Sequence, residues 1–177
     1  MGELPYSSEV EVIAAANTAI EYGHPAGDDG ARVTMAQAMS DWYDNAISKD
    51  DIFFTVGGSA ALRIIFRLIR AQNGRGRIIT QRPYYTFYNN PNHGSHLHFI
   101  EVMDEPRYRL TAATLTRSIE EVYRLEKADH NSISAFLFCD PNNPVGSVIG
   151  EKEWKKIIAL LKELCTGQKT NSCCATL

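Results

Sequence analysis

The sequence predicts an α/β protein with a mainly parallel sheet and flanking helices. Short apolar runs typical of buried strands alternate along the chain with longer segments of helical period. Glycine, proline and asparagine separate these segments, so most connections are expected to be short loops. The chain has 177 residues, of which 44% are hydrophobic, and this is enough for the core of one ordinary domain. Such alternation predicts right-handed crossovers between parallel strands.

The expected elements follow from hydrophobic period and from the residues that flank each segment. Ser8 and Glu11 form a capping-box pattern, which predicts that a first helix begins there. The further elements, in chain order, are a helix at 31–43, a strand at 52–56, a helix at 59–72, strands at 77–81 and 96–102, a helix at 112–126, a strand at 133–139 and a helix at 151–164. We expect residues 1–164 to form one partial domain and residues 165–177 an irregular tail.

The most informative motif is the loop DPNNPVG at residues 140–146, directly after the apolar run at 133–139. Proline fixes φ and lacks an N–H group, so the two asparagine side chains stay available for directional hydrogen bonds. In a parallel sheet this loop lies at the carboxyl edge, where open α/β sheets bind ligands. An Asx-Pro turn without a ligand is the alternative for an isolated motif of this kind.

Two other segments place polar or aromatic groups where expected strands end. Residues 55–62, TVGGSAAL, open a helix with glycines that let the backbone approach an anion and with free N–H groups at the positive end of the helix dipole. Residues 81–88, QRPYYTFY, carry rings that can stack on a flat heterocycle. Purely conformational glycines and core aromatic packing are the alternatives for the two segments taken singly.

In their order along the chain, 55–62, 81–88 and 140–146, the three segments resemble the large domain of the class I and II aminotransferases. These are fold-type-I pyridoxal-phosphate enzymes. The resemblance extends from about Leu4 to Leu164 and includes the stretch at 22–32. It implies pyridoxal 5'-phosphate as the cofactor, with its phosphate on the backbone amides of Gly58 and Ser59 and on the Ser59 hydroxyl. Tyr85 would stack on the pyridine ring, and Asn143 would bind the phenolic oxygen.

The resemblance also implies transfer of an amino group between an amino acid and a 2-oxo acid, by a homo-oligomer. The family's later motifs are not found in the sequence: the aspartate for the pyridine nitrogen, the Schiff-base lysine and the small domain with its carboxylate-binding arginine. A Schiff-base lysine must be partly desolvated, and the lysines present lie on a charged helix face or in polar loops. We therefore assign no catalytic residue and expect the chain alone to be inactive. The alternative function is that of a non-catalytic truncated remnant or interaction protein.

The family topology predicts a difficulty for the sheet. In the complete fold, the strand before the DPNNPVG loop is separated from the strand at 77–81 by a strand that comes later in the chain. A gap inside the sheet leaves N–H and C=O groups of apolar strands unpaired. We therefore expect the chain to be unstable or rearranged unless another element fills the gap.

Composition and charge argue against several other classes of function. A net charge of -3 without a basic stripe predicts no nucleic-acid binding. Four cysteines without metal-ligand spacing predict no metal site, and the lack of a signal peptide or membrane-length apolar run favours the cytoplasm. The last four residues, CATL at 174–177, fit a loose prenylation pattern, so membrane attachment is expected only if the C-terminal cysteines are lipidated.

Overall fold

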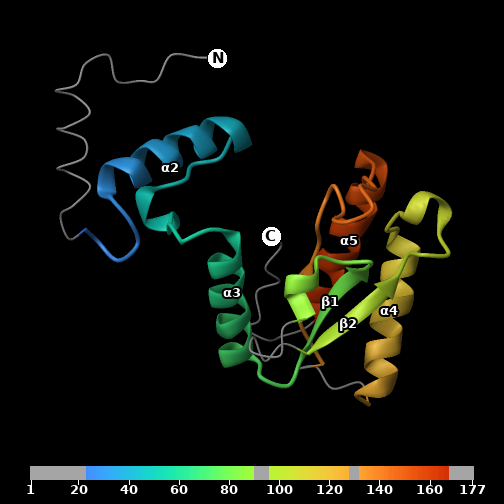
Figure 1. The fold of residues 1–177 in the computed structure, drawn as a ribbon. Coiled ribbons are helices and arrows are strands. Elements are labelled where there is room, and N and C mark those ends of the chain that lie inside the picture. The colour runs from blue at the N-terminus through green and yellow to red at the C-terminus, as the bar shows by residue number, and fades with distance from the viewer. Residues whose placement is uncertain (1–22, 90–95, 128–131, 168–177) are drawn as a thin grey trace. The chain divides into compact units, whose positions relative to one another are not determined.

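The computed structural model describes residues 23–89, 96–127 and 132–167 (Figure 1). The chain divides into two units, residues 1–57 and residues 58–177. The expected first helix at Ser8 and the CATL sequence at 174–177 lie outside the described residues. None of the helices within the described ranges combines the length and the apolar character that a membrane crossing requires.

The first unit contains the helix α2 (Asp29–Tyr43), close to the helix expected at 31–43. The Asp28 carboxylate caps its first turn by accepting a hydrogen bond from the Ala31 N–H at 2.8 Å. The helix ends at Asp44, whose φ of 48° lies in the left-handed region. A short 3-10 helix, η1 (Lys49–Asp51), follows and begins with a capping box between Ser48 and Asp51.

The prediction of a strand at 52–56 is wrong, because the backbone that follows η1 is irregular. A strand requires a neighbour that pairs along its length. Among the described residues, the long-range backbone hydrogen bond of this segment is the one from the Phe54 N–H to the Ala26 carbonyl at 2.9 Å. The side chains are not buried as a core strand would be, since Phe53 is 59% exposed and Val56 is 97% exposed. Apolar sequence alone therefore did not make this segment a strand.

The second unit is built on a three-stranded parallel sheet, which confirms the predicted fold class. Its strands are β1 (Arg77–Arg82), β2 (Leu97–Glu101) and β3 (Ile133–Leu137), in the spatial order β2-β1-β3. Three helices accompany the sheet: α3 (Gly58–Gln72), α4 (Ala112–Leu125) and α5 (Glu151–Gly167). Each lies within a few residues of its predicted range. The short 3-10 helices η2 (Thr86–Asn89) and η4 (Pro106–Tyr108) were not expected.

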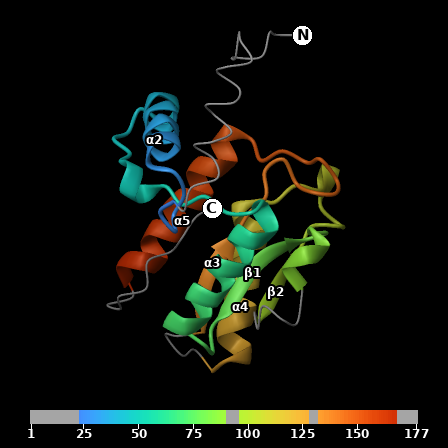
Figure 2. The ribbon, with the colours of Figure 1, turned by 60° about the vertical axis from the view of Figure 1, so that its left-hand side comes forward.

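The two faces of the sheet are covered by different helices (Figures 1 and 2). One face packs α4 and α5 against a large cluster that includes Ile79, Ile100 and Phe136. The opposite face packs α3 against a smaller cluster around Ile78 and Leu137. Adjacent strand residues such as Ile78 and Ile79 thus enter different clusters, as the alternation of side chains along a strand requires.

The expected gap in the sheet does not occur, because β1 pairs directly with β3. The pairing aligns Ile78 with Ala135 and Thr80 with Leu137, and its register shifts between Arg77 and Ile78. Direct pairing gives the apolar strand β3 a hydrogen-bonding neighbour and satisfies its inner edge. In this respect the chain is rearranged relative to the topology that the resemblance implied.

Candidate functional site

The predicted site residues of all three motifs lie at the same end of the second unit, which begins at Gly58. The short turn at 73–76 joins α3 to β1, so the first turn of α3 and the carboxyl end of β1 lie at one edge of the sheet (Figure 1). Because β1 and β3 are parallel neighbours, the loops that follow both strands also leave from this edge. Gly58 and Ser59, the loop with Tyr85 and the loop with Asn143 are therefore brought to one side of the sheet.

The first turn of α3 carries polar groups that are not engaged within the described part of the chain. Gly58 and Ser59 are exposed, and the Ser59 hydroxyl has no hydrogen-bond partner among the described residues. Gly57, the residue before the helix, has a φ of +78° and no side chain with which to cap the first turn. The arrangement leaves N–H groups and a hydroxyl available to an anion.

Tyr85 is exposed, while the nearby rings of Tyr84 and Tyr88 are packed. Its ring meets that of Tyr88 edge-on, with centroids 5.8 Å apart and planes at 87°, and the residue remains 39% exposed. Tyr88 is buried, and burial together with the adjacent Cys139 thiol raises the pKa of Tyr88 to about 12. Tyr84 stacks on Phe99 of β2, with centroids 4.9 Å apart. Tyr85 is thus an exposed ring on a packed aromatic base.

The two adjacent asparagines of the DPNNPVG loop have opposite environments. Asn142 is 3% exposed, and its side chain donates to the Pro83 carbonyl at 3.1 Å and accepts from the Val145 N–H at 3.3 Å. Asn143 is exposed, and its side chain makes no hydrogen bond to the described residues. Asn142 therefore serves the loop itself, whereas Asn143 is free to contact a ligand.

Asp140 anchors the same loop to the helix that follows it. One carboxylate oxygen accepts from the Ile149 N–H at 3.0 Å, and the other accepts from the Trp154 indole N–H at 2.7 Å. The Trp154 ring in turn packs edge-on against Phe138. Asp140 and Asn142 were not among the predicted site residues, because nothing in the sequence of this loop separates its buried members from its exposed ones.

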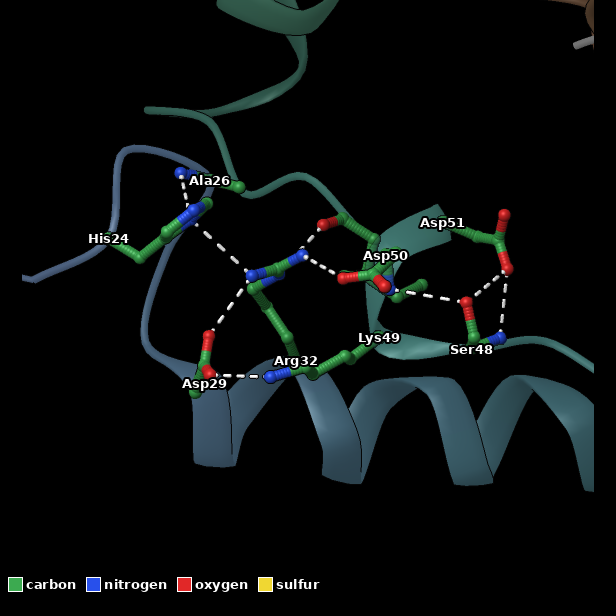
Figure 3. A network of polar contacts seen from close by, with 9 residues as sticks. His24, Ala26, Asp29, Arg32, Ser48, Lys49, Asp50 and Asp51 are labelled. Carbon is green, nitrogen blue, oxygen red and sulfur yellow. Dashed lines mark hydrogen bonds and ion pairs between the residues drawn. The ribbon is translucent and has the colours of Figure 1, made fainter.

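Arg32, at the end of the 22–32 stretch, lies in the first unit, where its side chain binds other residues of that unit (Figure 3). Its guanidinium donates to the Ile52 carbonyl at 3.0 Å and to Asp29 at 3.1 Å, and it lies 3.4 Å from Asp50. Asp29 also accepts from the Lys49 ammonium at 2.6 Å, and this bond lowers the pKa of Asp29. These contacts join the start of α2 to the backbone after η1, so Arg32 holds the first unit together.

Histidine and acidic side chains do not assemble a metal centre in the described ranges, where no three His, Cys, Asp or Glu residues gather around a common point. His96 lies next to Arg70, with 3.3 Å between their nitrogens, and His98 belongs to the edge strand β2.

The comparisons with known proteins decide the family. Residues 5–166 match the family described as aminotransferase class I and II. The chain belongs to the class I and II aminotransferase family. This family depends on pyridoxal 5'-phosphate in general. The match covers nearly the whole chain, including the ordered set of motifs on which the resemblance was based.

Curated relatives of this aminotransferase chain are much longer than the chain itself. Nicotianamine aminotransferase B of Hordeum vulgare is 29% identical over 159 residues, which are 89% of this chain and 27% of the relative. Alanine aminotransferase 2, mitochondrial, of Arabidopsis thaliana is 25% identical over 144 residues, or 80% of this chain and 26% of the relative. The chain thus spans about a quarter of the length of these relatives.

Solved structures agree on the fold. A tetra mutant of Thermus thermophilus aspartate aminotransferase superposes with a TM-score of 0.67 and 22% identity, over 93% of this chain and 44% of that chain. An aminotransferase from Eubacterium rectale gives the same TM-score of 0.67 over 89% of this chain and 39% of the other. At this level of identity the structures establish the fold of the aminotransferase large domain, whereas the predicted roles of Gly58, Ser59, Tyr85 and Asn143 stay predictions.

Proposed function

We propose that the chain provides the pyridoxal-phosphate-binding part of an aminotransferase large domain. In this proposal the N–H groups of Gly58 and Ser59 and the Ser59 hydroxyl hold the phosphate. The ring of Tyr85 stacks on the pyridine, and the Asn143 amide donates to the phenolic oxygen. When bound, the cofactor supplies the electron sink that transfer of an amino group requires.

The observation that carries the proposal is the contrast between engaged and free groups at the carboxyl edge of the sheet. Asn142 and Asp140 are used up in holding the loop, while the neighbouring Asn143 side chain and the Ser59 hydroxyl make no hydrogen bond to the described residues. Tyr85 similarly keeps an exposed ring above the buried Tyr88. An anion-binding helix start, an aromatic plane and an amide fit the phosphate, the ring and the phenolic oxygen of the cofactor.

No lysine is assigned to a covalent link with the cofactor. On α5, the Lys155 ammonium lies 2.6 Å from Glu151 and the Lys156 ammonium lies 3.1 Å from Glu153. Both lysines are exposed, and a solvated, paired ammonium is a poor nucleophile at neutral pH. The proposal for this chain therefore concerns non-covalent cofactor binding, and transamination of an amino acid with a 2-oxo acid is proposed for a protein that contains the complete fold.

We further propose that such a protein is a homo-oligomer. The support within this chain is α3, on which Phe66 is the buried residue while Ile64 and Leu68 remain 41% and 58% exposed. Apolar residues spaced four apart on a helix form a continuous stripe, and exposed stripes of this kind are typical of surfaces that another polypeptide covers.

Titration with pyridoxal 5'-phosphate and, separately, with inorganic phosphate tests the cofactor proposal. Each group contributes about 1 kcal/mol, so we expect binding in the millimolar to high micromolar range. Ser59→Ala should weaken both ligands by about fivefold, whereas Tyr85→Ala and Asn143→Ala should weaken only pyridoxal 5'-phosphate.

Asn45→Ala is the matched control, because Asn45 is exposed and belongs to the first unit. It should leave both affinities unchanged. Affinities that none of the three site substitutions alters would reject the assignment of the site.

A further inference from the structure

We propose that Asn142 is a positioning residue that holds the Asn143 loop against the Tyr85 loop. The inference rests on the proposed function, since these two loops carry two of the three groups assigned to the cofactor. Asn142 itself is buried and faces away from solvent, so it is not expected to touch the cofactor.

The backbone N–H, the backbone carbonyl and both polar atoms of the Asn142 side chain each make a hydrogen bond. Its N–H donates to the Ser147 carbonyl at 2.9 Å, and its carbonyl accepts from the Gly146 N–H at 2.7 Å. The side-chain oxygen accepts from the Val145 N–H at 3.3 Å. These three bonds fold residues 142–147 into a closed loop whose fixed point is Asn142, and Asn143 is the first residue to project from it.

The fourth bond leaves the loop and reaches the segment after β1. The Asn142 side-chain nitrogen donates to the carbonyl of Pro83 at 3.1 Å. Pro83 precedes Tyr84 and Tyr85, so this bond connects the backbone that carries the exposed ring to the backbone that carries the exposed amide. The Asn142 side chain thus directly links the segment that carries the stacking group to the loop that carries the hydrogen-bonding group.

The chemistry at position 142 requires a carboxamide. The site needs one acceptor for the Val145 N–H and one donor for the Pro83 carbonyl, and a side-chain amide provides both on adjacent atoms. An ionised carboxylate has acceptors only, so it would face the Pro83 carbonyl with like partial charge. A protonated carboxyl group would again offer a donor and an acceptor.

A second hydrogen bond nearby also connects the β1 side to the β3 side. The Gln81 side-chain nitrogen donates to the Cys139 carbonyl at 3.4 Å, so the end of β1 is joined to the end of β3 just before the two loops begin. Gln81 is buried at 3% exposure, and its amide oxygen is buried without a hydrogen-bond partner in the described residues. The Gln81 bond is long at 3.4 Å, and the bond from Asn142 to the Pro83 carbonyl is shorter at 3.1 Å.

The test is Asn142→Asp, with Asn143→Asp as the matched control that introduces the same charge one residue away. Hydrogen exchange of residues 84–89, followed by mass spectrometry, reports on the Tyr85 loop without any cofactor. Near neutral pH, Asn142→Asp should raise exchange of this segment by about fivefold relative to wild type, the change expected from one net hydrogen bond, while Asn143→Asp should leave it unchanged.

Acidification provides the readout that a merely structural defect would not give. Burial raises the pKa of a carboxyl group, so Asp at position 142 should become protonated in mildly acidic buffer and restore the donor to the Pro83 carbonyl. The exchange ratio of Asn142→Asp to wild type at the same pH should then return toward one. Affinity for pyridoxal 5'-phosphate, if wild type binds it, should recover in parallel.

Three results would overturn the inference: faster exchange confined to residues 140–147, equal acceleration of residues 84–89 in both variants, or global exchange that acid does not reverse. Exchange decides the role of Asn142 even where no cofactor binds, and absence of binding in wild type would reject the proposed function instead.

Discussion

The two units of the chain are stabilised by different interactions. Within the described residues of the first unit, 23–57, the buried apolar side chains are Ala26 and Ala36, and the central residue is the charged Arg32. In the second unit, two apolar clusters fill both faces of a parallel sheet. Directional bonds to one guanidinium define the first unit, whereas the volume of the core defines the second. Substitutions that remove apolar volume and substitutions that remove a charge should therefore affect different units of the chain.

The largest effect is expected from Leu115→Ala in α4, because Leu115 is fully buried in the main core of the second unit. Loss of its transfer free energy and the cavity left behind should reduce the free energy of unfolding by about 2–5 kcal/mol. Urea denaturation followed by circular dichroism measures this. Leu125→Ala, the same change at an exposed position of the same helix, should cost far less.

Arg32→Met should destabilise the first unit by about 2 kcal/mol, since it leaves the Ile52 carbonyl without its charged donor and separates Asp29 from its buried partner. Hydrogen exchange should rise in residues 26–54 and stay unchanged in β1 and β3. The control is Arg124→Met, where a 3.9 Å contact with Glu121 is exposed and is expected to contribute little. Equal exchange of both units after Arg32→Met would contradict the comparison.

Gly27→Ala addresses the same unit through the backbone. Gly27 has a φ of +111°, and a Cβ atom built there would lie 2.6 Å from the Phe54 ring. Strain and the displaced ring should together cost about 1–2 kcal/mol. Gly30→Ala serves as the comparison, because Gly30 lies in α2 without a positive φ. Similar melting temperatures for the two variants would show that the Phe54 contact is unimportant.

The smallest effect is a pH dependence from His98 in the second unit. Burial lowers the pKa of His98 from 6.5, while Glu121 opposes the shift and Arg77 adds to it. The unfolded chain then binds more protons than the folded chain, so the stability contributed by neutral His98 is present above pH 6.5 and is lost as the pH falls toward the folded-state pKa. His98→Gln should remove this slope from a series of denaturation curves. An unchanged slope would assign the dependence to another group.

Much of the second unit could be predicted from the sequence because hydrophobic period and burial agree there. The stripe of α4 and the runs of β1 and β3 each pack where their pattern indicates. The run at 52–56 has an equally apolar pattern, but pairing depends on a neighbouring strand, and its sequence carries no information on that neighbour. The direct pairing of β1 with β3 was missed for the same reason.

Part of the candidate site could likewise be predicted from the sequence, and part of it could not. Loops that follow strands in a parallel sheet reach its carboxyl edge, so the positions of Tyr85 and Asn143 could be inferred from the order of the elements. Ser59 lies at the same edge for a different reason, because it begins the helix that leads into β1 and no strand precedes it in the described part of the chain. The different roles of Asn142 and Asn143 could not be inferred, because both are asparagines in one proline-rich loop. Asn142 is distinguished by its burial and by its contact with the carbonyl of Pro83, a residue distant in the sequence.

Pairing of β1 with β3 has a consequence for the order of events on the ribosome. Both strands are complete once residue 137 has been synthesised, and their ladder from Ile78 and Ala135 to Thr80 and Leu137 can close before any later segment emerges. In a longer polypeptide whose topology placed a further strand between them, that strand would arrive at a closed ladder and would have to displace it. Cotranslational folding would then pass through the pairing described for this chain, and the rate of insertion would depend on how readily the ladder opens.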